Sequence, residues 1–179
     1  MILIESKTVG TAVSGVEFTS IPQTFTDVVL QVSGRSSTGS TRADIFLTIN
    51  GDTGSNYSIR RLIGFDSGSV QSYAESVTPT QTNLISITGN GATADTFGNL
   101  GFYFPNYTST TTKSFSVDNT AENNSTSAYI MGIFAGRYTT SSAITSIKIE
   151  PQSSNFMTGS ILSLYGVLKG SDGIVTTSP

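Results

Sequence analysis

Histidine, cysteine and tryptophan are absent from this chain of 179 residues. Without histidine or cysteine, the common nucleophilic catalytic systems and an ordinary zinc site cannot be built. The lack of cysteine also excludes a small secreted domain held together by disulfides. We therefore expect a protein that is not an enzyme, with no catalytic residues and no bound cofactor or metal.

Charged residues are also scarce. They make up 12% of the chain, against roughly 25% in ordinary soluble domains. The formal net charge of -3 and the pI near 4.7 give no basic surface for nucleic acid or anionic lipid. No apolar run approaches the roughly 20 residues that cross a bilayer, and the N-terminus lacks the basic start of a secretory signal. We expect no nucleic-acid or membrane partner, and synthesis in a cytoplasm.

The apolar residues that are present follow a period of two. Val28, Leu30 and Val32 share one face of an extended segment, and residues 45–49 repeat the pattern. Similar segments recur between turns rich in glycine, asparagine and proline, and no segment shows sustained helical spacing. The pattern predicts an all-β sandwich or barrel of about ten strands. No linker or repeat divides the chain, so residues 1–179 are predicted to form a single domain, with residues 170–179 as an extended tail.

Two of the predicted strands, within residues 128–138 and 160–168, are apolar on both faces. In the first, Met131 and Ile133 face away from Ile130 and Phe134. A strand in a two-layer β protein usually has one wet face, so a second apolar face predicts a cover. Either a loop of the same chain or another subunit could provide it.

The N-terminal residues are apolar as well. Residues 1–10 form either an arm that is buried against a neighbour or the first edge strand of the same sheet. The resulting candidate assembly contacts are Ile2, Leu3, Ile4, Met131, Ile133 and Leu162.

Three other patterns have a chemical and a structural interpretation. Residues 50–56 (NGDTGSN) resemble a calcium loop but lack most of its negative charge, which favours a turn held by side-chain-to-backbone bonds; residues 118–124 favour the same interpretation. The acidic residues are spread singly, and nothing selects the pair that a glycosidase needs. The seven tyrosines could stack on sugar rings, although strand tyrosines are more often half-buried.

Several blocks of the sequence resemble a group of tailed-phage virion proteins. The blocks are SIPQTFTDVVL at residues 20–30, NGDTGSNYS at 50–58, PNYT at 105–108, KSFSV at 113–117, AGRY at 135–138, AITSI at 143–147 and LYGVLKG at 164–170. The similarity extends from about residue 16 to residue 173. It implies a jelly-roll-like, two-sheet antiparallel β-sandwich with a structural or adhesive role, and it carries no catalytic residues.

We therefore expect a phage virion structural protein, made in the host cytoplasm. The favoured role is a capsid decoration (cement) protein that binds the major capsid protein and stabilises the head shell. We expect it to act as a homo-oligomer, with a trimer favoured. The alternative is a receptor-binding or carbohydrate-binding module attached to a tail protein. The short chain, which has no fibre repeat, favours decoration.

Overall fold

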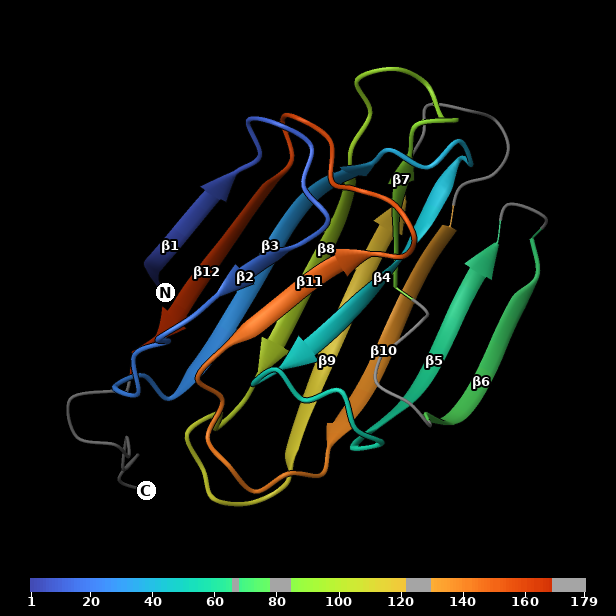
Figure 1. The fold of residues 1–179 in the computed structure, drawn as a ribbon. Coiled ribbons are helices and arrows are strands. Elements are labelled where there is room, and N and C mark those ends of the chain that lie inside the picture. The colour runs from blue at the N-terminus through green and yellow to red at the C-terminus, as the bar shows by residue number, and fades with distance from the viewer. Residues whose placement is uncertain (66–67, 78–84, 122–129, 169–179) are drawn as a thin grey trace, which may run out of the picture.

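The structure is a computed structural model that describes residues 1–65, 68–77, 85–121 and 130–168. These residues form strands and turns and contain no helix (Figure 1). The all-β prediction is therefore confirmed. The strands are β1 (Ile2–Thr8), β2 (Val16–Phe18), β3 (Asp27–Ser36), β4 (Arg42–Ile49), β5 (Tyr57–Phe65), β6 (Val70–Val77), β7 (Ile85–Gly89), β8 (Gly98–Phe104), β9 (Lys113–Ala121), β10 (Ile130–Tyr138), β11 (Ile147–Pro151) and β12 (Ile161–Val167).

All of these strands belong to one hydrogen-bonded sheet. Its order is β2-β11-β4-β7-β3-β8-β9-β10-β5-β6, and β12 and β1 extend from β3 as a branch. Every pairing is antiparallel except that of β3 with β7, where Arg35 lies beside Thr88 and Ser36 beside Gly89. The sheet is therefore mixed and continuous, whereas the sequence predicted two separate antiparallel sheets. The reason is the length of β3: its last residues run past β8 and pair with β7.

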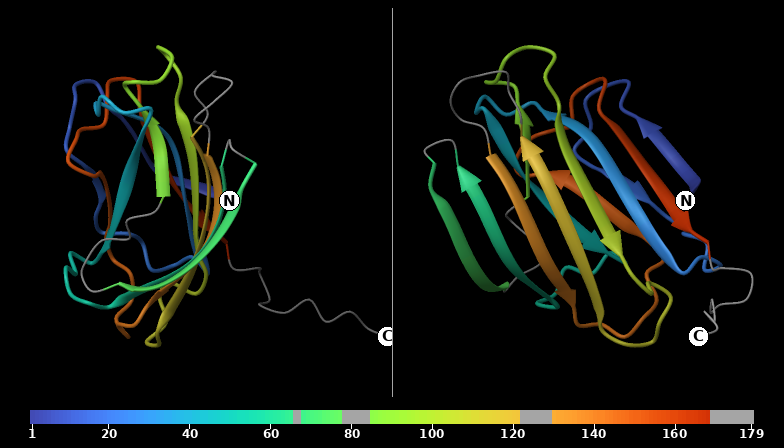
Figure 2. Two further views of the ribbon diagram at one scale, coloured as in Figure 1. Left: turned by 90° about the vertical axis from the view of Figure 1, so that its right-hand side faces the viewer. Right: turned by 180° about the vertical axis from the view of Figure 1, so that it is seen from behind.

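The sheet folds over itself into two layers (Figure 2, left). The strands β2, β11, β4 and β7 lie in front of the longer run of strands in Figure 1. Between the layers, Phe115 and Val117 of β9 are buried in the hydrophobic core. The side-chain amide of Asn119 on β9 donates to the backbone oxygen of Ser86 on β7 at 3.0 Å. This bond connects two strands that are not neighbours in the sheet.

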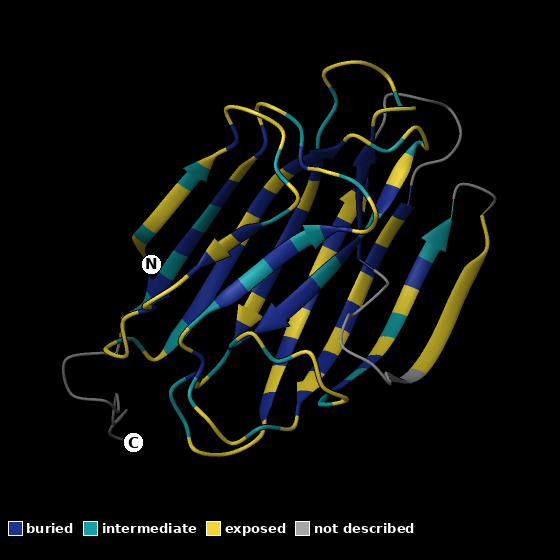
Figure 3. Ribbon diagram, in the orientation of Figure 1, coloured by how far each residue is buried: buried dark blue, intermediate teal, exposed yellow. Residues whose placement is uncertain are grey.

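The predicted core faces of two strands are confirmed. Leu30 on β3 and Leu47 on β4 are both fully buried. In β9 and β10, buried and exposed residues alternate without interruption (Figure 3). One face of each of these strands therefore packs in the core and the other faces away from it.

The turn after β4 has the geometry that Asn-Gly sequences favour. Asn50 and Gly51 both have positive φ, 53° and 66°, and the Asp52 N–H donates to the Ile49 carbonyl at 2.9 Å. An Asn-Gly turn at this place predicts a hairpin between residues 45–49 and 57–63, and this prediction is wrong. β4 pairs with β11 and β7, and β5 pairs with β10 and β6, so the segment after this turn passes from one layer to the other.

Candidate assembly surface

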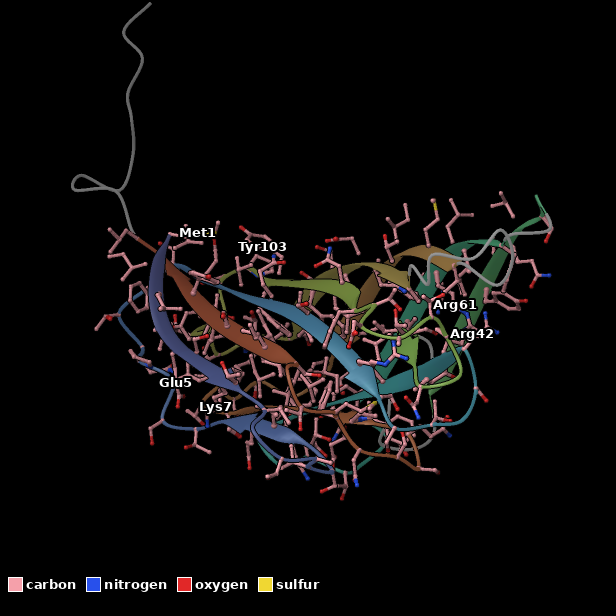
Figure 4. All side chains as sticks on the ribbon, turned by 90° about the horizontal axis from the view of Figure 1, so that it is seen from above. Met1, Glu5, Lys7, Arg42, Arg61 and Tyr103 are labelled. Carbon is pink, nitrogen blue, oxygen red and sulfur yellow. The ribbon has the colours of Figure 1, made fainter. Side chains whose placement is uncertain are left out.

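The longer layer contains β1, β12, β3, β8, β9, β10, β5 and β6 in that order. We call the side of this layer that faces away from β2, β11, β4 and β7 the outer face; in the part of the chain that the structure describes, no strand covers it. Figure 4 looks along the layers, with Tyr103 standing on the outer side. The register sets outer-face side chains in rows, such as Asp118, Ile133 and Leu62 on β9, β10 and β5. These rows decide which side chains a partner would meet together.

Four large apolar side chains gather at one end of the outer face. Met131 and Ile133 on β10 are 55% and 61% exposed, Leu62 on β5 is 45% exposed, and Val70 on β6 is 66% exposed. Ile133 lies beside Leu62, while Met131 and Val70 lie on either side of Gly64. We call these four residues the β10 patch. Contiguous exposed apolar surfaces of this kind are typical of sites that bind other molecules.

The surface of the patch is hollowed in two adjoining places. One hollow has a volume of about 590 Å³ and extends over β6, β5, β10 and β9. The other has a volume of about 390 Å³ and contains Val70 and Met131 in its lining. Both are lined by Leu62, Asp118 and Ile133. The patch therefore contains hollows into which the side chains of a partner can fit.

One acidic and one basic residue lie next to the patch, on two adjacent sides of it. Asp118 on β9 lies in the same row as Ile133, and Arg60 on β5 lies in the next row, beside Ala135. Both are exposed. The Asp118 carboxylate extends toward β8, because a Cβ added at Gly101 would lie 2.9 Å from its Oδ1. The apolar centre thus has a negative side and a positive side.

The N-terminal candidates lie at the opposite edge of the sheet. β1 pairs antiparallel with β12 and has a bulge between Leu3 and Glu5, so the edge-strand alternative is the one that the structure shows. Ile2 and Leu3 are 45% and 52% exposed, while Ile4 is partly buried against the core. Lys7 donates from Nζ to the Glu17 backbone oxygen at 2.6 Å, which ties β1 to β2. A bulge and charged side chains are features that protect an edge strand from pairing further.

Leu162, the remaining predicted contact, has a different position. It is fully buried in the core, beside Val32 in the register of β12 with β3. It therefore cannot reach a partner across the outer face. Its neighbour Ile161, 44% exposed, occupies the accessible position. The sequence could not distinguish the two because both faces of this segment are apolar.

Asp52 shows why residues 50–56 form a turn. Its carboxylate accepts hydrogen bonds from the Gly54 N–H, the Asn56 side chain, the Tyr138 hydroxyl and the Thr140 hydroxyl. Burial by itself raises the pKa of Asp52, but these hydrogen bonds outweigh it and hold the pKa below the ordinary value of 3.8. Both carboxylate oxygens therefore already have protein donors. In the described ranges, no group of three acidic side chains is placed to hold a metal ion.

The other acidic residues and tyrosines are dispersed. Asp44 accepts from the Ser86 hydroxyl at 2.9 Å, and Asp66 and Glu122 lie outside the described residues. Among the described tyrosines, only Tyr73 and Tyr103 are exposed, at 37% and 41%. The Tyr103 hydroxyl donates to Asp27 at 2.8 Å, which raises the pKa of Tyr103. The predicted tail, residues 170–179, also falls outside the described part of the chain.

Sequence reasoning found half of the β10 patch and missed the rest. Leu62 was recognisable, because it alternates with the buried Ile59 and Ile63 and so belongs to the opposite face. Val70 begins β6, a strand that was not predicted because its sequence VQSYAESV is largely polar. An edge strand that packs on one neighbour only can be this polar.

Comparisons with known proteins assign no family to the chain. No protein-family model and no curated protein matches it. The likeness of its blocks to tailed-phage virion proteins therefore stays a prediction from the sequence. Among the described residues, no helix is long and apolar enough to cross a membrane.

Proposed function

We propose that this chain is a structural protein of a phage virion, and that it acts as a capsid decoration protein on the head shell. The observation that carries the proposal is the outer face with its β10 patch, which no strand of the described residues covers. Exposing four large apolar side chains together is unfavourable in water. Because each is about half exposed, covering what remains contributes roughly half of the 1.5–3 kcal/mol of a full burial. Assembly with other protein subunits is the function that this surface supports best.

The proposal includes a finer assignment of the fold. We infer a jelly-roll-like β-sandwich in which the two layers act as its two sheets, joined where β3 meets β7. The alternation of buried and exposed residues in β9 and β10 and the hydrogen bond from Asn119 to Ser86 support this assignment. The outer face is then the broad side that such a module presents to its partners.

The composition of the surface supports a binding role rather than a catalytic one. The chain contains no histidine or cysteine. The β10 patch is bordered by Ser72, Ser116 and Thr120, whose hydroxyls can bond across an interface without the desolvation cost of buried charges. We propose that the protein is not an enzyme and requires no cofactor.

The proposed partners are further copies of the chain and the major capsid protein. Two exposed apolar regions are available for them: the β10 patch at one end of the outer face, and Ile2 and Leu3 on β1 at the other. The functional form is proposed to be a homo-oligomer, with the trimer favoured from the sequence.

The copy number of the chain in purified virions tests the proposal. A decoration protein covers the shell, so quantitative gel analysis should find hundreds of copies per particle, in a fixed ratio to the major capsid protein. A protein that is absent from washed particles would contradict the virion role altogether.

A second candidate, a tail module that binds receptors or carbohydrate, is favoured by one observation. The larger hollow, on the outer face, is lined by Arg60, Ser116 and Asp118, whose polar groups can hydrogen-bond to sugar hydroxyls. A few copies per virion, together with selective binding on a glycan array that Asp118→Ala abolishes, would favour this role. The head-decoration role predicts no such selectivity.

A further inference from the structure

We propose that the β10 patch is a self-complementary interface at which two copies of this chain pack face to face around a twofold axis. The inference deepens the proposed assembly role and rests on it, because it names the occupant of one of the two apolar regions. It follows from the arrangement of charge around the patch.

Self-complementarity requires that each charged group meet its opposite in the second copy. In a face-to-face pair, the twofold axis lies in the plane between the two sheets, and each position of one copy faces its reflection across that axis. Asp118 lies beside Ile133 on β9 and Arg60 lies one row past Leu62 on β5, so the two are two strands and one row apart. An axis midway between the two residues sets Asp118 of one copy opposite Arg60 of the second copy. By symmetry, it also sets Arg60 of the first copy opposite Asp118 of the second. This axis crosses the patch between Ile133 and Leu62.

The apolar residues suit the same arrangement. With the axis between Ile133 and Leu62, each of these side chains packs against the other one in the second copy, at the centre of the contact. Ala135 on β10 and Gly64 on β5 are small and allow the second sheet to approach closely. The two charge pairs lie at the sides, where they select this orientation over a rotated one. A carbohydrate would not use four aliphatic side chains in this way.

The arrangement predicts an even number of copies in solution. A single twofold contact gives a dimer, and the same contact between two trimers gives a hexamer. It leaves Ile2 and Leu3 at the far edge of the sheet free for the shell. Copy number on virions and mass in solution are separate measurements, so failure of the pairing is distinguishable from failure of the virion role.

Sedimentation of the purified full-length protein over a range of concentrations tests the pairing. We expect a dimer or hexamer that dissociates into halves on dilution. Ile133→Asp replaces an exposed side chain, so the fold should survive while association weakens at least about tenfold. A monomer at all concentrations, or a trimer that does not pair, would overturn the inference.

A charge exchange provides the sharper test. Arg60→Asp and Asp118→Arg each set like charges against each other at two places in the dimer, so each should weaken association about tenfold or more. The double variant restores both pairs in reverse and should recover most of the affinity. Lys148→Asp, an equal charge change on β11 of the other layer, is the matched control. If the double variant associates no better than the single ones, Arg60 and Asp118 are not opposed and the proposed axis is wrong.

Discussion

Tyr138 donates its phenolic hydrogen to Oδ2 of Asp52 across 3.0 Å, which joins the turn after β4 to the end of β10. The same carboxylate accepts from the Gly54 N–H and the Asn56 side chain, both at 2.7 Å. Tyr57 also donates to the Asp52 backbone oxygen at 3.0 Å, and its ring lies 5.0 Å from that of Tyr138. One aspartate thus fixes the passage of the chain from one layer to the other.

Asp52→Asn should destabilise the protein by about 1–3 kcal/mol near neutral pH, because it weakens hydrogen bonds to a charged acceptor. The pKa of Asp52 is lowered in the folded state. Its contribution is therefore fully present above the unfolded pKa, near 4, and is lost as the pH falls through the folded pKa. Urea unfolding at pH 7 and at pH 3 should show the gap between variant and wild type narrowing in acid. Exposed Asp95→Asn is the control, and a gap of equal size at both pH values would contradict this role.

Truncating a core leucine should lower the free energy of unfolding much more than truncating a leucine of the outer face. Leu30 is fully buried and Leu62 is 45% exposed. Leu30→Ala should cost about 2–5 kcal/mol through lost burial and a residual cavity, whereas Leu62→Ala should cost less than about 1 kcal/mol. Chemical unfolding under conditions in which the protein is monomeric measures both. Equal losses would mean that the faces of β3 or β5 are assigned incorrectly.

Two neighbouring residues on β1 should respond differently to the same change. Ile4 packs partly against the core, while Leu3 is 52% exposed. Ile4→Ser should lower the free energy of unfolding by about 1 kcal/mol or more, and Leu3→Ser should change it by no more than about 0.5 kcal/mol. Thermal melting of both variants checks this. If Leu3→Ser proves the more damaging, β1 does not pair with β12 in the register described.

Arg35 should hold the segment between β7 and β8 in place. Its buried guanidinium donates from Nη1 to the Thr93 and Thr96 carbonyls at 2.8 Å and from Nη2 to the Ala92 carbonyl at 3.1 Å. Lysine cannot reproduce this planar fork, so Arg35→Lys should cost about 1–3 kcal/mol and speed hydrogen exchange in residues 90–97. Arg137→Lys on the exposed face of β10 should leave both unchanged. Unaltered exchange in Arg35→Lys would show that other contacts hold this segment.

The sequence predicted the parts of the fold that depend on local alternation. Leu30, Leu47 and the β10 residues Met131 and Ile133 have the facing that a period of two assigns to them. Strand pairing was harder to predict from the sequence, because Asn50 and Gly51 favour a turn but do not specify which strands it joins. The pairing of β4 with β11 and β7 depends on contacts between residues far apart in the chain.

The candidate surface was only partly predictable for the same reason. The two-faced apolar pattern identified Met131 and Ile133, but Val70 joins them only because β6 lies beside β5. Similarly, the placement of Asp118 and Arg60 next to the patch depends on the register of three neighbouring strands. Neither relationship is visible in residue spacing along the chain.

The most direct test of the assembly role is the copy number of this chain per virion, measured by quantitative gel of particles purified and washed in high salt. The account predicts hundreds of copies in a fixed ratio to the major capsid protein, because the exposed apolar surfaces are covered by other subunits of a shell. Complete absence of the chain from washed particles would contradict it.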